Sequence, residues 1–274
     1  MIVFPPCKIN LGLNILRKRV DGFHDLETVF YPVPFTDVLE AVEVHGAKEK
    51  VSLQTYGLSV SGNPNNNLVL KAYHLLDNAY DLPPTEFCLY KNIPMGAGLG
   101  GGSADGAYAI RLLNDLYQLN LSIETQLSFA AQLGSDCAFF IYDSACKGEG
   151  RGEILEPISL ALTGYYLCLV KPQIHISTAE AFAGIKPKEK TAQELAAYWV
   201  QQNIDKWQTN LNNDFEASLF PKYPILAELK ETFLQAGAVY AAMSGSGSTI
   251  FALFKQAPKL AAKFEGHFYQ EIQL

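Results

Sequence analysis

The sequence lacks the features that would mark a secreted, disulfide-bonded or membrane protein. Its five cysteines are scattered and odd in number, and no two of them form a C-x-x-C pair. This usage argues for reduced thiols and against a disulfide framework or a structural zinc site. The start, Met1-Ile-Val-Phe-Pro-Pro, has neither the basic residues nor the apolar run of a secretory signal, and no apolar run could cross a bilayer. We therefore expect a soluble cytoplasmic protein.

The sequence also contains fewer basic residues than acidic ones. The chain carries 21 Lys and Arg against 28 Asp and Glu, a formal charge of −7. This balance argues against broad nucleic-acid binding through a basic surface. A single bound nucleotide needs only a local cluster of donors, which the net charge neither supports nor excludes. The 274 residues, 49% of them hydrophobic, suffice for one large domain or two modest ones.

The most informative stretch is rich in glycine and runs from Pro94 to Asp105, with five glycines in seven residues. Its glycines can bring backbone N–H groups close to a ligand, because no Cβ stands in the way. Downstream, Ala107, Ile110, Leu113 and Tyr117 recur at three- and four-residue steps, which predicts a helix starting near Ser103. Such a helix start offers unpaired N–H groups and a positive dipole end, and both favour phosphate.

Three interpretations of this loop compete. A flexible surface turn rarely combines so many glycines with an immediate amphipathic helix. The spacing Gly96-x-Gly98-x-x-Gly101 matches a dinucleotide fingerprint, but that motif follows a buried parallel strand near the start of a βαβ unit. Here the preceding run, residues 86–93, is partly polar and lies in the middle of the chain. A phosphate loop for a nucleoside triphosphate fits best, although it is not a Walker A loop.

The N-terminal region predicts a hairpin of strands. Residues 7–15 alternate between apolar and polar, Asp21-Gly22 marks a turn, and residues 24–33 form the returning strand. The polar positions Lys8 and Asn10 fit an ordinary solvated face. With Phe23 and His24 they fit the lining of a polar pocket equally well.

Further elements follow from local signals. We expect a strand pair at 38–44 and 51–58, a helix from Leu68 capped by Asn67, and a helix between Ser122 and Gly134. Asp136 follows that helix and is either a plain N-cap or a functional carboxylate. A hairpin turn at 148–152, a domain join at 159–164 and a strand at 165–170 come next. A capping box at Thr191 and Glu194 predicts a helix to about Gln202. Pro224 is the first residue of another predicted helix, which ends at Gly237. A glycine–serine turn then leads into a strand that ends at Phe254.

Taken jointly, these stretches resemble the GHMP kinases, the superfamily of galactokinase, homoserine kinase and mevalonate kinase. The first motif is matched by Lys8-Ile-Asn10-Leu-Gly-Leu and Asp21-Gly-Phe-His24, the second by Pro94–Asp105 and the third by Ser244-Gly-Ser-Gly-Ser-Thr-Ile-Phe251. Leu133-Gly-Ser-Asp136 and Asn213-Asp-Phe-Glu216 fit the subfamily of the non-mevalonate isoprenoid route. The motifs occur in family order across nearly the whole chain.

The resemblance implies a two-lobed α+β fold, with an N-terminal ATP-binding lobe at 1–160, a C-terminal α/β lobe at 161–274 and an active site in the cleft between them. It implies phosphorylation, with ATP and Mg²⁺, of the 2-hydroxyl of 4-diphosphocytidyl-2-C-methyl-D-erythritol. The partners are then small molecules, not nucleic acid or membrane, and the protein is a monomer or homodimer. A mevalonate- or homoserine-type kinase, or a catalytically silent nucleotide-binding protein, remains an alternative.

The resemblance also implies roles for single residues. Asp136 matches the base that accepts the hydroxyl proton, and Lys8 lies beside it. Substrate-binding positions are Asn10, Phe23, His24 and Thr178. Asn67 matches an adenine-side position of the ATP site. The other ATP-binding positions are Pro94, Gly96, Gly98, Leu99, Gly100, Gly101, Gly102 and Ser103, of which Gly98 to Ser103 hold the phosphates, and Gly245 and Gly247 lie near the phosphate. Two residues depart from the pattern: Phe23 replaces a common tyrosine, and Ala104 replaces a common serine, which leaves Ser103 as the candidate hydroxyl near Mg²⁺.

Overall fold

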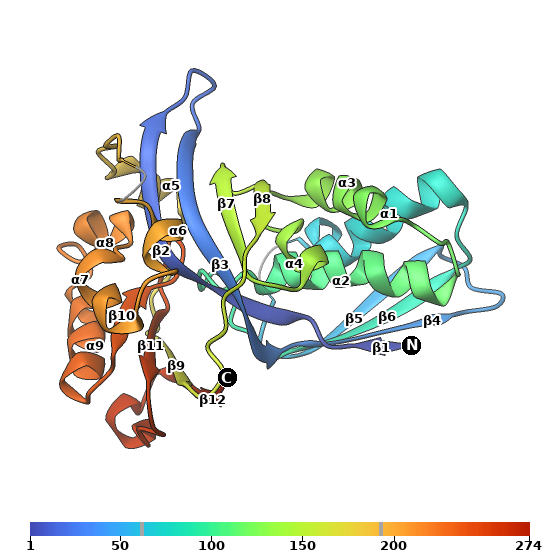
Figure 1. Ribbon diagram of the computed structural model, residues 1–274. Helices are drawn as coiled ribbons and strands as arrows, with labels where there is room; N and C mark the ends of the chain where they lie inside the picture. Colours follow the sequence, from blue (N-terminus) through green and yellow to red (C-terminus); the bar gives the residue numbers. More distant parts are fainter. Residues whose placement is uncertain (61–62, 192–193) are drawn as a thin grey trace. The chain divides into compact units, whose positions relative to one another are not determined.

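The computed structural model describes residues 1–60, 63–191 and 194–274 (Figure 1). The chain forms two compact units that interleave along the sequence. Unit 1 contains residues 1–7, 32–95 and 100–144, and unit 2 contains residues 8–31, 96–99 and 145–274. The sequence domains 1–160 and 161–274 stay a prediction, and each unit is described by itself below.

Unit 1 is built on a four-stranded sheet of order β1-β4-β6-β5. Its strands are β1 (Ile2–Val3), β4 (Val38–Glu43), β5 (Val51–Gly57) and β6 (Thr85–Lys91). The sequence predicted both β4 and β5, but their pairing with each other was wrong. The strand β6 separates them, antiparallel to β4 and parallel to β5. Helix α1 carries the chain from β5 to β6, and a crossover of this kind is what parallel pairing requires.

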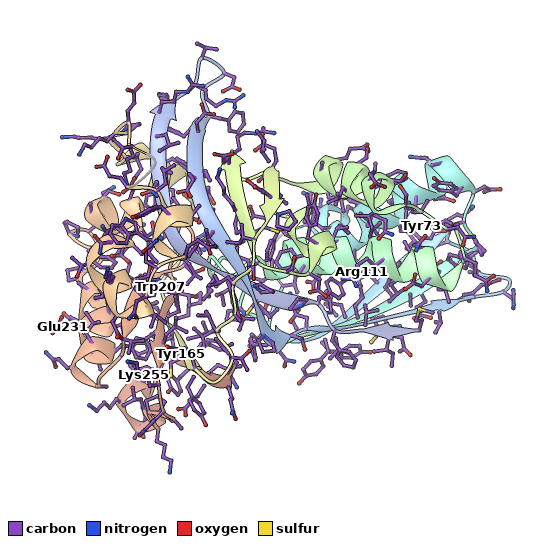
Figure 2. The ribbon with its side chains drawn as sticks, viewed as in Figure 1. Tyr73, Arg111, Tyr165, Trp207, Glu231 and Lys255 are labelled. Atoms are coloured by element: carbon purple, nitrogen blue, oxygen red, sulfur yellow. The ribbon has the colours of Figure 1, made fainter. Side chains whose placement is uncertain are left out.

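Helices cover one face of this sheet (Figure 1). They are η1 (Pro64–Asn66), α1 (Leu68–Tyr80), α2 (Gly101–Leu116), α3 (Ile123–Leu133) and α4 (Phe139–Tyr142). The predicted caps are confirmed: the side chain of Asn67 accepts a hydrogen bond from the Val69 N–H, and that of Ser122 accepts one from the Thr125 N–H. Tyr73 of α1 lies fully buried in this layer (Figure 2).

In unit 2, one sheet has the order β2-β3-β7-β8. Its strands are β2 (Pro6–Lys18), β3 (His24–Thr36), β7 (Cys146–Gly150) and β8 (Ile154–Pro157), and the first two extend from unit 2 into unit 1. Both faces of β2 are buried, and the exposed fractions of Lys8, Asn10 and Asn14 are only 3%, 2% and 3%. Of the two interpretations of Lys8 and Asn10, the ordinary solvated face is therefore excluded.

The second sheet of unit 2 has the order β10-β11-β9-β12. Its strands are β9 (Tyr166–Lys171), β10 (Tyr240–Met243), β11 (Ile250–Phe254) and β12 (Phe268–Gln273). The helices of the unit are α5 (Thr178–Ala183), α6 (Ala196–Trp199), η3 (Ile204–Lys206), α7 (Trp207–Asn210), α8 (Asp214–Leu219), α9 (Pro224–Gln235) and η4 (Ala261–Phe264). Trp207 of α7 is buried edge-on against Tyr240 (Figure 2).

The helix predicted from Thr191 to about Gln202 is wrong in length. The backbone N–H and hydroxyl of Thr191 do donate to the Glu194 carboxylate, but residues 192 and 193 lie outside the described part of the chain. Among the described residues of this stretch, the α-helix is α6, which ends at Trp199. Its first N–H groups, those of Ala196 and Ala197, donate at 2.9 and 2.8 Å to the buried carboxylate of Glu27. The cap comes from a distant strand, so the local capping box could not locate the helix.

Candidate active site

The glycine loop has a backbone that only glycine adopts without strain. Gly96, Gly98 and Gly100 have φ angles of +60°, +74° and +72°. Helix α2 follows at once, starting at Gly101 rather than Ser103, and its N-cap Gly100 has no side chain to block the helix end. A Cβ added to Gly102 would meet no atom within 4 Å. This open approach to an uncapped helix start fits the phosphates of ATP.

Lys8 is bound to the middle of this loop within unit 2. Its Nζ donates to the Asn10 Oδ1 at 2.6 Å and to the Gly98 carbonyl at 2.9 Å, and its backbone N–H donates to the Leu99 carbonyl at 2.9 Å. Asn10 in turn donates from Nδ2 to the Thr28 hydroxyl at 3.0 Å. A nearly buried ammonium is thereby fixed against the phosphate loop.

The third motif forms the other wall of the loop. It is the turn between the antiparallel strands β10 and β11. It also forms hydrogen bonds with the glycine loop, which an ordinary hairpin turn would not do. The Ser244 hydroxyl donates to the Gly98 carbonyl at 2.9 Å, and the Thr249 N–H donates to the Ala97 carbonyl at 3.2 Å. A Cβ on Gly98 would lie 2.0 Å from the Ser244 carbonyl oxygen. Gly245 and Gly247 both have positive φ in this turn.

The subfamily motif that begins at Asn213 has a structural explanation. The side-chain amide of Asn213 donates to the carbonyls of Met243 and Gly245 at 2.7 and 2.8 Å, while its oxygen caps α8. Glu216, one turn later, accepts a hydrogen bond from the Met243 N–H at 2.7 Å. Asn213 and Glu216 thus hold the start of the glycine–serine turn.

Asp136 lies in the other half of the predicted site, in unit 1. It occupies the turn between α3 and α4 and is followed by the buried thiol of Cys137. Burial raises the pKa of Cys137 to about 12, a hydrogen bond with the Ser103 side chain lowers it, and the charge of Asp136 raises it. The Ser103 contact brings the segment of Asp136 to the first turn of α2. Asn67, predicted on the adenine side, uses its side chain to cap α1.

Three of the four predicted substrate-binding residues, Phe23, His24 and Thr178, lie in one partly aromatic region of unit 2, whereas Asn10 lies beside Lys8. Phe23 is 54% exposed, and the guanidinium of Arg151 lies 5.0 Å from its ring centroid. His24 stacks on Phe182 with centroids 5.0 Å apart, and Phe182 belongs to α5, whose first residue is Thr178. Burial, and secondarily the charge of Lys18, lowers the pKa of His24. The structure thus brings Phe23, His24 and α5 to one region.

Sequence reasoning missed two residues of this region. Arg151 lies in the turn between β7 and β8, and β7 pairs with β3 so that Gly150 lies opposite Leu26. The only sequence signal was a lone arginine within a glycine-rich hairpin. Phe182 follows Thr178 by four residues, one helical turn, and this spacing offered a signal that was not used.

A buried ion triad beneath the glycine loop was also missed. The Nζ of Lys91 donates to Asp37 and, at 2.6 Å, to Asp105, and the Lys91 and Asp37 side chains are fully buried. Burial raises the pKa of Asp105 to about 7, Lys91 opposes this rise, and the charge of Asp37 adds to it. Lys91 is the last residue of β6, and a lysine at a strand end is usually solvated, so its burial with two carboxylates was not predicted.

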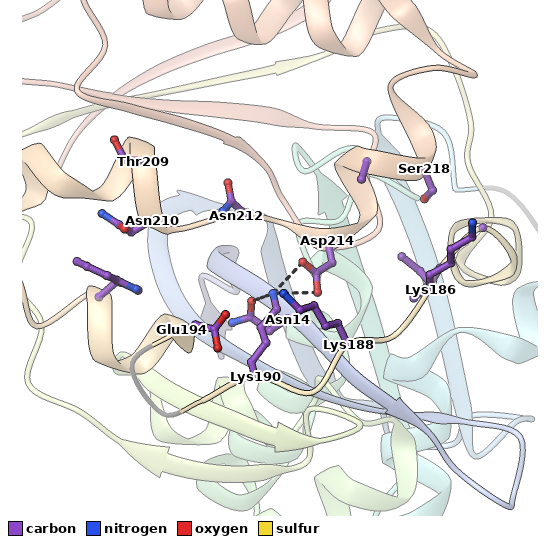
Figure 3. Close-up of a pocket in the computed structure, with 14 residues that line it drawn as sticks. Asn14, Lys186, Lys188, Lys190, Glu194, Thr209, Asn210, Asn212, Asp214 and Ser218 are labelled. Carbon is purple, nitrogen blue, oxygen red and sulfur yellow. Dashed lines mark hydrogen bonds and ion pairs between the residues drawn. The ribbon is translucent and has the colours of Figure 1, made fainter.

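A separate pocket of about 680 Å³ lies in unit 2 (Figure 3). Its Lys190 donates to Asn14 and forms an ion pair of 2.9 Å with Asp214, while Lys186 and Lys188 are exposed. Among the described residues, those that line this pocket include none of the predicted site residues. The partly buried ammonium of Lys190 is already paired, and the pocket is distinct from the candidate site.

The donor set among the described residues leaves Mg²⁺ a prediction. Within residues 1–60, 63–191 and 194–274, no group of three or more His, Cys, Asp or Glu side chains could hold a metal ion. Kinases usually bind Mg²⁺ through one or two protein oxygens together with substrate phosphates, so this finding is compatible with an ion held jointly by the protein and ATP.

In the same described part, no helix is long and apolar enough to span a membrane.

Two family models match the chain. The model of the GHMP kinases N terminal domain matches residues 67–144, and that of the GHMP kinases C terminal domain matches residues 191–270. The first match includes the glycine loop and Asp136. The second includes Asn213 and the glycine–serine turn.

Similar curated proteins extend the match over the full length. A protein of Bacteroides fragilis named 4-diphosphocytidyl-2-C-methyl-D-erythritol kinase is 48% identical over 277 residues, which cover 100% of both chains. A protein of the same name from Thermodesulfovibrio yellowstonii is 36% identical, over 97% of this chain and 95% of that one.

Solved structures share the fold. A crystal structure of 4-(cytidine 5'-diphospho)-2C-methyl-D-erythritol kinase superposes with a TM-score of 0.81 at 26% identity, covering 100% of both chains. A homoserine kinase from Cytophaga hutchinsonii gives a TM-score of 0.74 at 18% identity, over 99% of this chain and 93% of that one, which shows likeness of fold alone. The predicted α+β architecture is confirmed.

Proposed function

The chain belongs to the GHMP kinase family, and on that premise we propose that it phosphorylates the 2-hydroxyl of 4-diphosphocytidyl-2-C-methyl-D-erythritol. The donor is ATP, and the reaction belongs to the non-mevalonate route to isoprenoid precursors. The full-length similarity to the curated kinase of Bacteroides fragilis carries this conclusion. The two family matches fall one within each predicted domain, which supports the division into 1–160 and 161–274.

The acceptor sets a demanding task for the site. Carbon 2 of a 2-C-methyl-erythritol bears the methyl group as well as the hydroxyl, so the attacking oxygen is tertiary and crowded. Phosphoryl transfer depends mainly on in-line positioning and on stabilising the charge of the transferring group. A protein that uses this acceptor must therefore hold the hydroxyl firmly and remove its proton as the new P–O bond forms.

We assign the proton acceptor to Asp136 and charge stabilisation to Lys8. The ammonium of Lys8 is fixed by Asn10 and Gly98, so it is preorganised and needs no rearrangement during the reaction. The segment of Asp136 lies by the first turn of α2, where Ser103 contacts Cys137. Within this proposal, the carboxylate and the ammonium act on the same hydroxyl.

Phosphate binding is assigned to residues Gly98 to Ser103. The open space at Gly102 and the uncapped start of α2 leave their N–H groups accessible to the ATP phosphates. When bound, Mg²⁺ shields the phosphate charge. The Ser103 hydroxyl is the candidate protein ligand, with the remaining positions supplied by phosphate and water.

The cytidyl group is assigned to the aromatic region of Phe23 and His24. The exposed Phe23 ring offers a stacking face, with the Arg151 guanidinium over it. The His24 imidazole, held against Phe182, offers a ring nitrogen to the polar edge of cytosine. None of the described cysteines forms a disulfide, which is consistent with a cytoplasmic enzyme.

An acceptor panel with γ-labelled ATP tests the assignment. We expect label transfer to the cytidyl-diphospho alcohol and at most a trace to mevalonate or homoserine. Asp136→Asn should lower turnover by on the order of 10²–10⁴-fold, the usual share of general acid–base catalysis. Asp115→Asn, an exposed carboxylate on α2, is the matched control and should behave as wild type. Strong transfer to an acceptor without cytidine would overturn the substrate assignment, and turnover within twofold of wild type would remove Asp136 from the base role.

A further inference from the structure

The buried triad of Lys91, Asp37 and Asp105 joins the two ends of the glycine loop. Lys91 is the last residue of β6, which leads into the loop, and Asp105 lies in the second turn of α2, which leads out of it. Asp37 lies just before β4. One ammonium therefore bridges the chain before the loop to the chain after it.

Asp37 also forms hydrogen bonds with the backbone of the residues that enter the glycine loop. Its Oδ1 accepts hydrogen bonds from the N–H groups of Asn92 and Ile93, at 2.6 and 2.8 Å, while its Oδ2 accepts from Lys91. The amide of Asn92 also donates to the Thr36 carbonyl at 3.0 Å. Both peptide groups that leave β6 are thus bonded to one buried carboxylate.

The Lys91 side chain also lies close to the first residue of α2. A Cβ on Gly101 would lie 3.4 Å from the Lys91 Nζ and 2.8 Å from the Cγ2 of Ile93. Ile93 therefore leaves no room for a methyl group on Gly101, and the Lys91 ammonium lies beside the same residue. The N–H groups assigned to phosphate are in this same first turn.

Charge alone does not explain the triad. One ammonium with two carboxyl groups carries no net positive charge whether or not Asp105 is protonated, so the triad does not attract ATP by its charge. An unpaired buried ammonium would attract it more strongly, so the two carboxylates make sense as anchors rather than as part of an anion site.

We propose that the Lys91–Asp37–Asp105 triad is a positioning device that preorganises the glycine loop for the ATP phosphates. The inference rests on the proposed function of the loop. The three residues do not touch the phosphates and act through the backbone at residues 92–93 and 101–103. Removing the bridge while keeping the formal charge should loosen the loop and weaken ATP binding, with little effect on the acceptor alcohol.

The test variant is Lys91→Met/Asp105→Asn, which removes the bridge, keeps the formal charge and leaves Asp37 bonded to Asn92 and Ile93. Lys50→Met/Asp81→Asn makes the same substitutions in an exposed ion pair of the same unit and is the control. Asp105→Asn alone keeps an acceptor for Lys91 and should stay near wild type. Hydrogen exchange of amides 92–103 reports loop order, and titration with a non-hydrolysable ATP analogue reports affinity.

We expect exchange about tenfold faster at 92–103, analogue binding weakened about tenfold or more, and an acceptor KM within about twofold of wild type. Unchanged exchange in the folded double variant, or faster exchange with unchanged analogue binding, would overturn the proposal. If the double variant does not fold, Lys91→Gln is measured instead, and unchanged exchange or unchanged analogue binding in that variant would again overturn the proposal. A wild-type protein that fails to bind the analogue would reject the proposed function itself, and that result is visible before any variant is made.

Discussion

The ammonium of Lys8 and the carbonyl oxygen of Gly98 are joined by a hydrogen bond of 2.9 Å across 90 residues of sequence. The bond links the first strand of the predicted hairpin to the middle of the glycine loop. It places a fixed positive charge, 3% exposed, against the segment assigned to phosphate. The first prediction follows from this pair.

Lys8→Met should lower turnover by roughly 10²–10³-fold, the loss typical of removing one preorganised charge donor. The variant should fold, because methionine fills a similar volume. Lys8→Arg should not restore activity, since the larger guanidinium cannot occupy a buried site shaped by Asn10 and Gly98. Steady-state turnover at saturating substrates measures the effect, and exposed Lys48→Met is the control. Full activity in Lys8→Met would contradict the assigned role.

Two glycines of the loop should respond in opposite ways to alanine. Gly98→Ala forces a side chain onto φ +74° and to within 2.0 Å of the Ser244 carbonyl, so the free energy of unfolding should fall by about 2–4 kcal/mol. Gly102→Ala meets open space in the first turn of α2 and should keep or slightly raise stability, by up to about 1 kcal/mol. Its methyl group should nevertheless raise the KM for ATP.

Chemical denaturation and ATP saturation curves separate these two effects. Equal destabilisation of both variants would show that the loop is uniformly constrained. An unchanged KM for ATP in Gly102→Ala would show that phosphate does not approach this residue.

Acceptor binding should depend on the protonation of His24. Its pKa is lowered from the ordinary value of 6.5, so the imidazole is neutral at pH 7. The dissociation constant of the acceptor, measured without ATP, should stay flat above about pH 6.5 and rise as the pH falls through the lowered pKa. His24→Asn should abolish this dependence. Tighter binding on acidification would show that the imidazolium is the binding form.

The same shift has a consequence for stability with a definite sign. Because the folded state binds the His24 proton less readily than the unfolded state, the contribution of His24 to stability rises with pH. It is complete above the unfolded pKa of about 6.5 and is lost as the pH falls below it. A melting temperature that falls less on acidification in His24→Asn than in wild type would agree with this sign.

Local chemistry explains which parts of the fold could be predicted. The caps at Asn67 and Ser122 and the helix start at Pro224 depend on residues within one helical turn, and the structure confirms them. Residues that contact distant segments were harder to interpret. Lys8 and Asn10 resemble a solvated strand face until Gly98 and Thr28 are brought beside them.

The same limit explains the errors. The pairing of β4 and β5 failed because β6, which separates them, comes later in the chain. The helix at 191–202 failed because its cap is the Glu27 carboxylate, more than 160 residues away. Lys91 and Arg151 are ordinary basic residues in the sequence. Their roles are recognised only from their partners, Asp105 and the Phe23 ring, which lie in other elements. The apposition of Lys8 and Asp136 stays a prediction.

Proton-coupled ³¹P NMR of the reaction product tests the central claim most directly. The purified protein is incubated with ATP, Mg²⁺ and the cytidyl-diphospho-methylerythritol alcohol. Carbon 2 bears no hydrogen, so a phosphate on its oxygen has no proton three bonds away. We predict that the new phosphomonoester signal is a singlet and that it is absent with Asp136→Asn over the same time. A doublet or triplet would place the phosphate on another hydroxyl, and no new signal from the wild-type protein would contradict the proposed reaction.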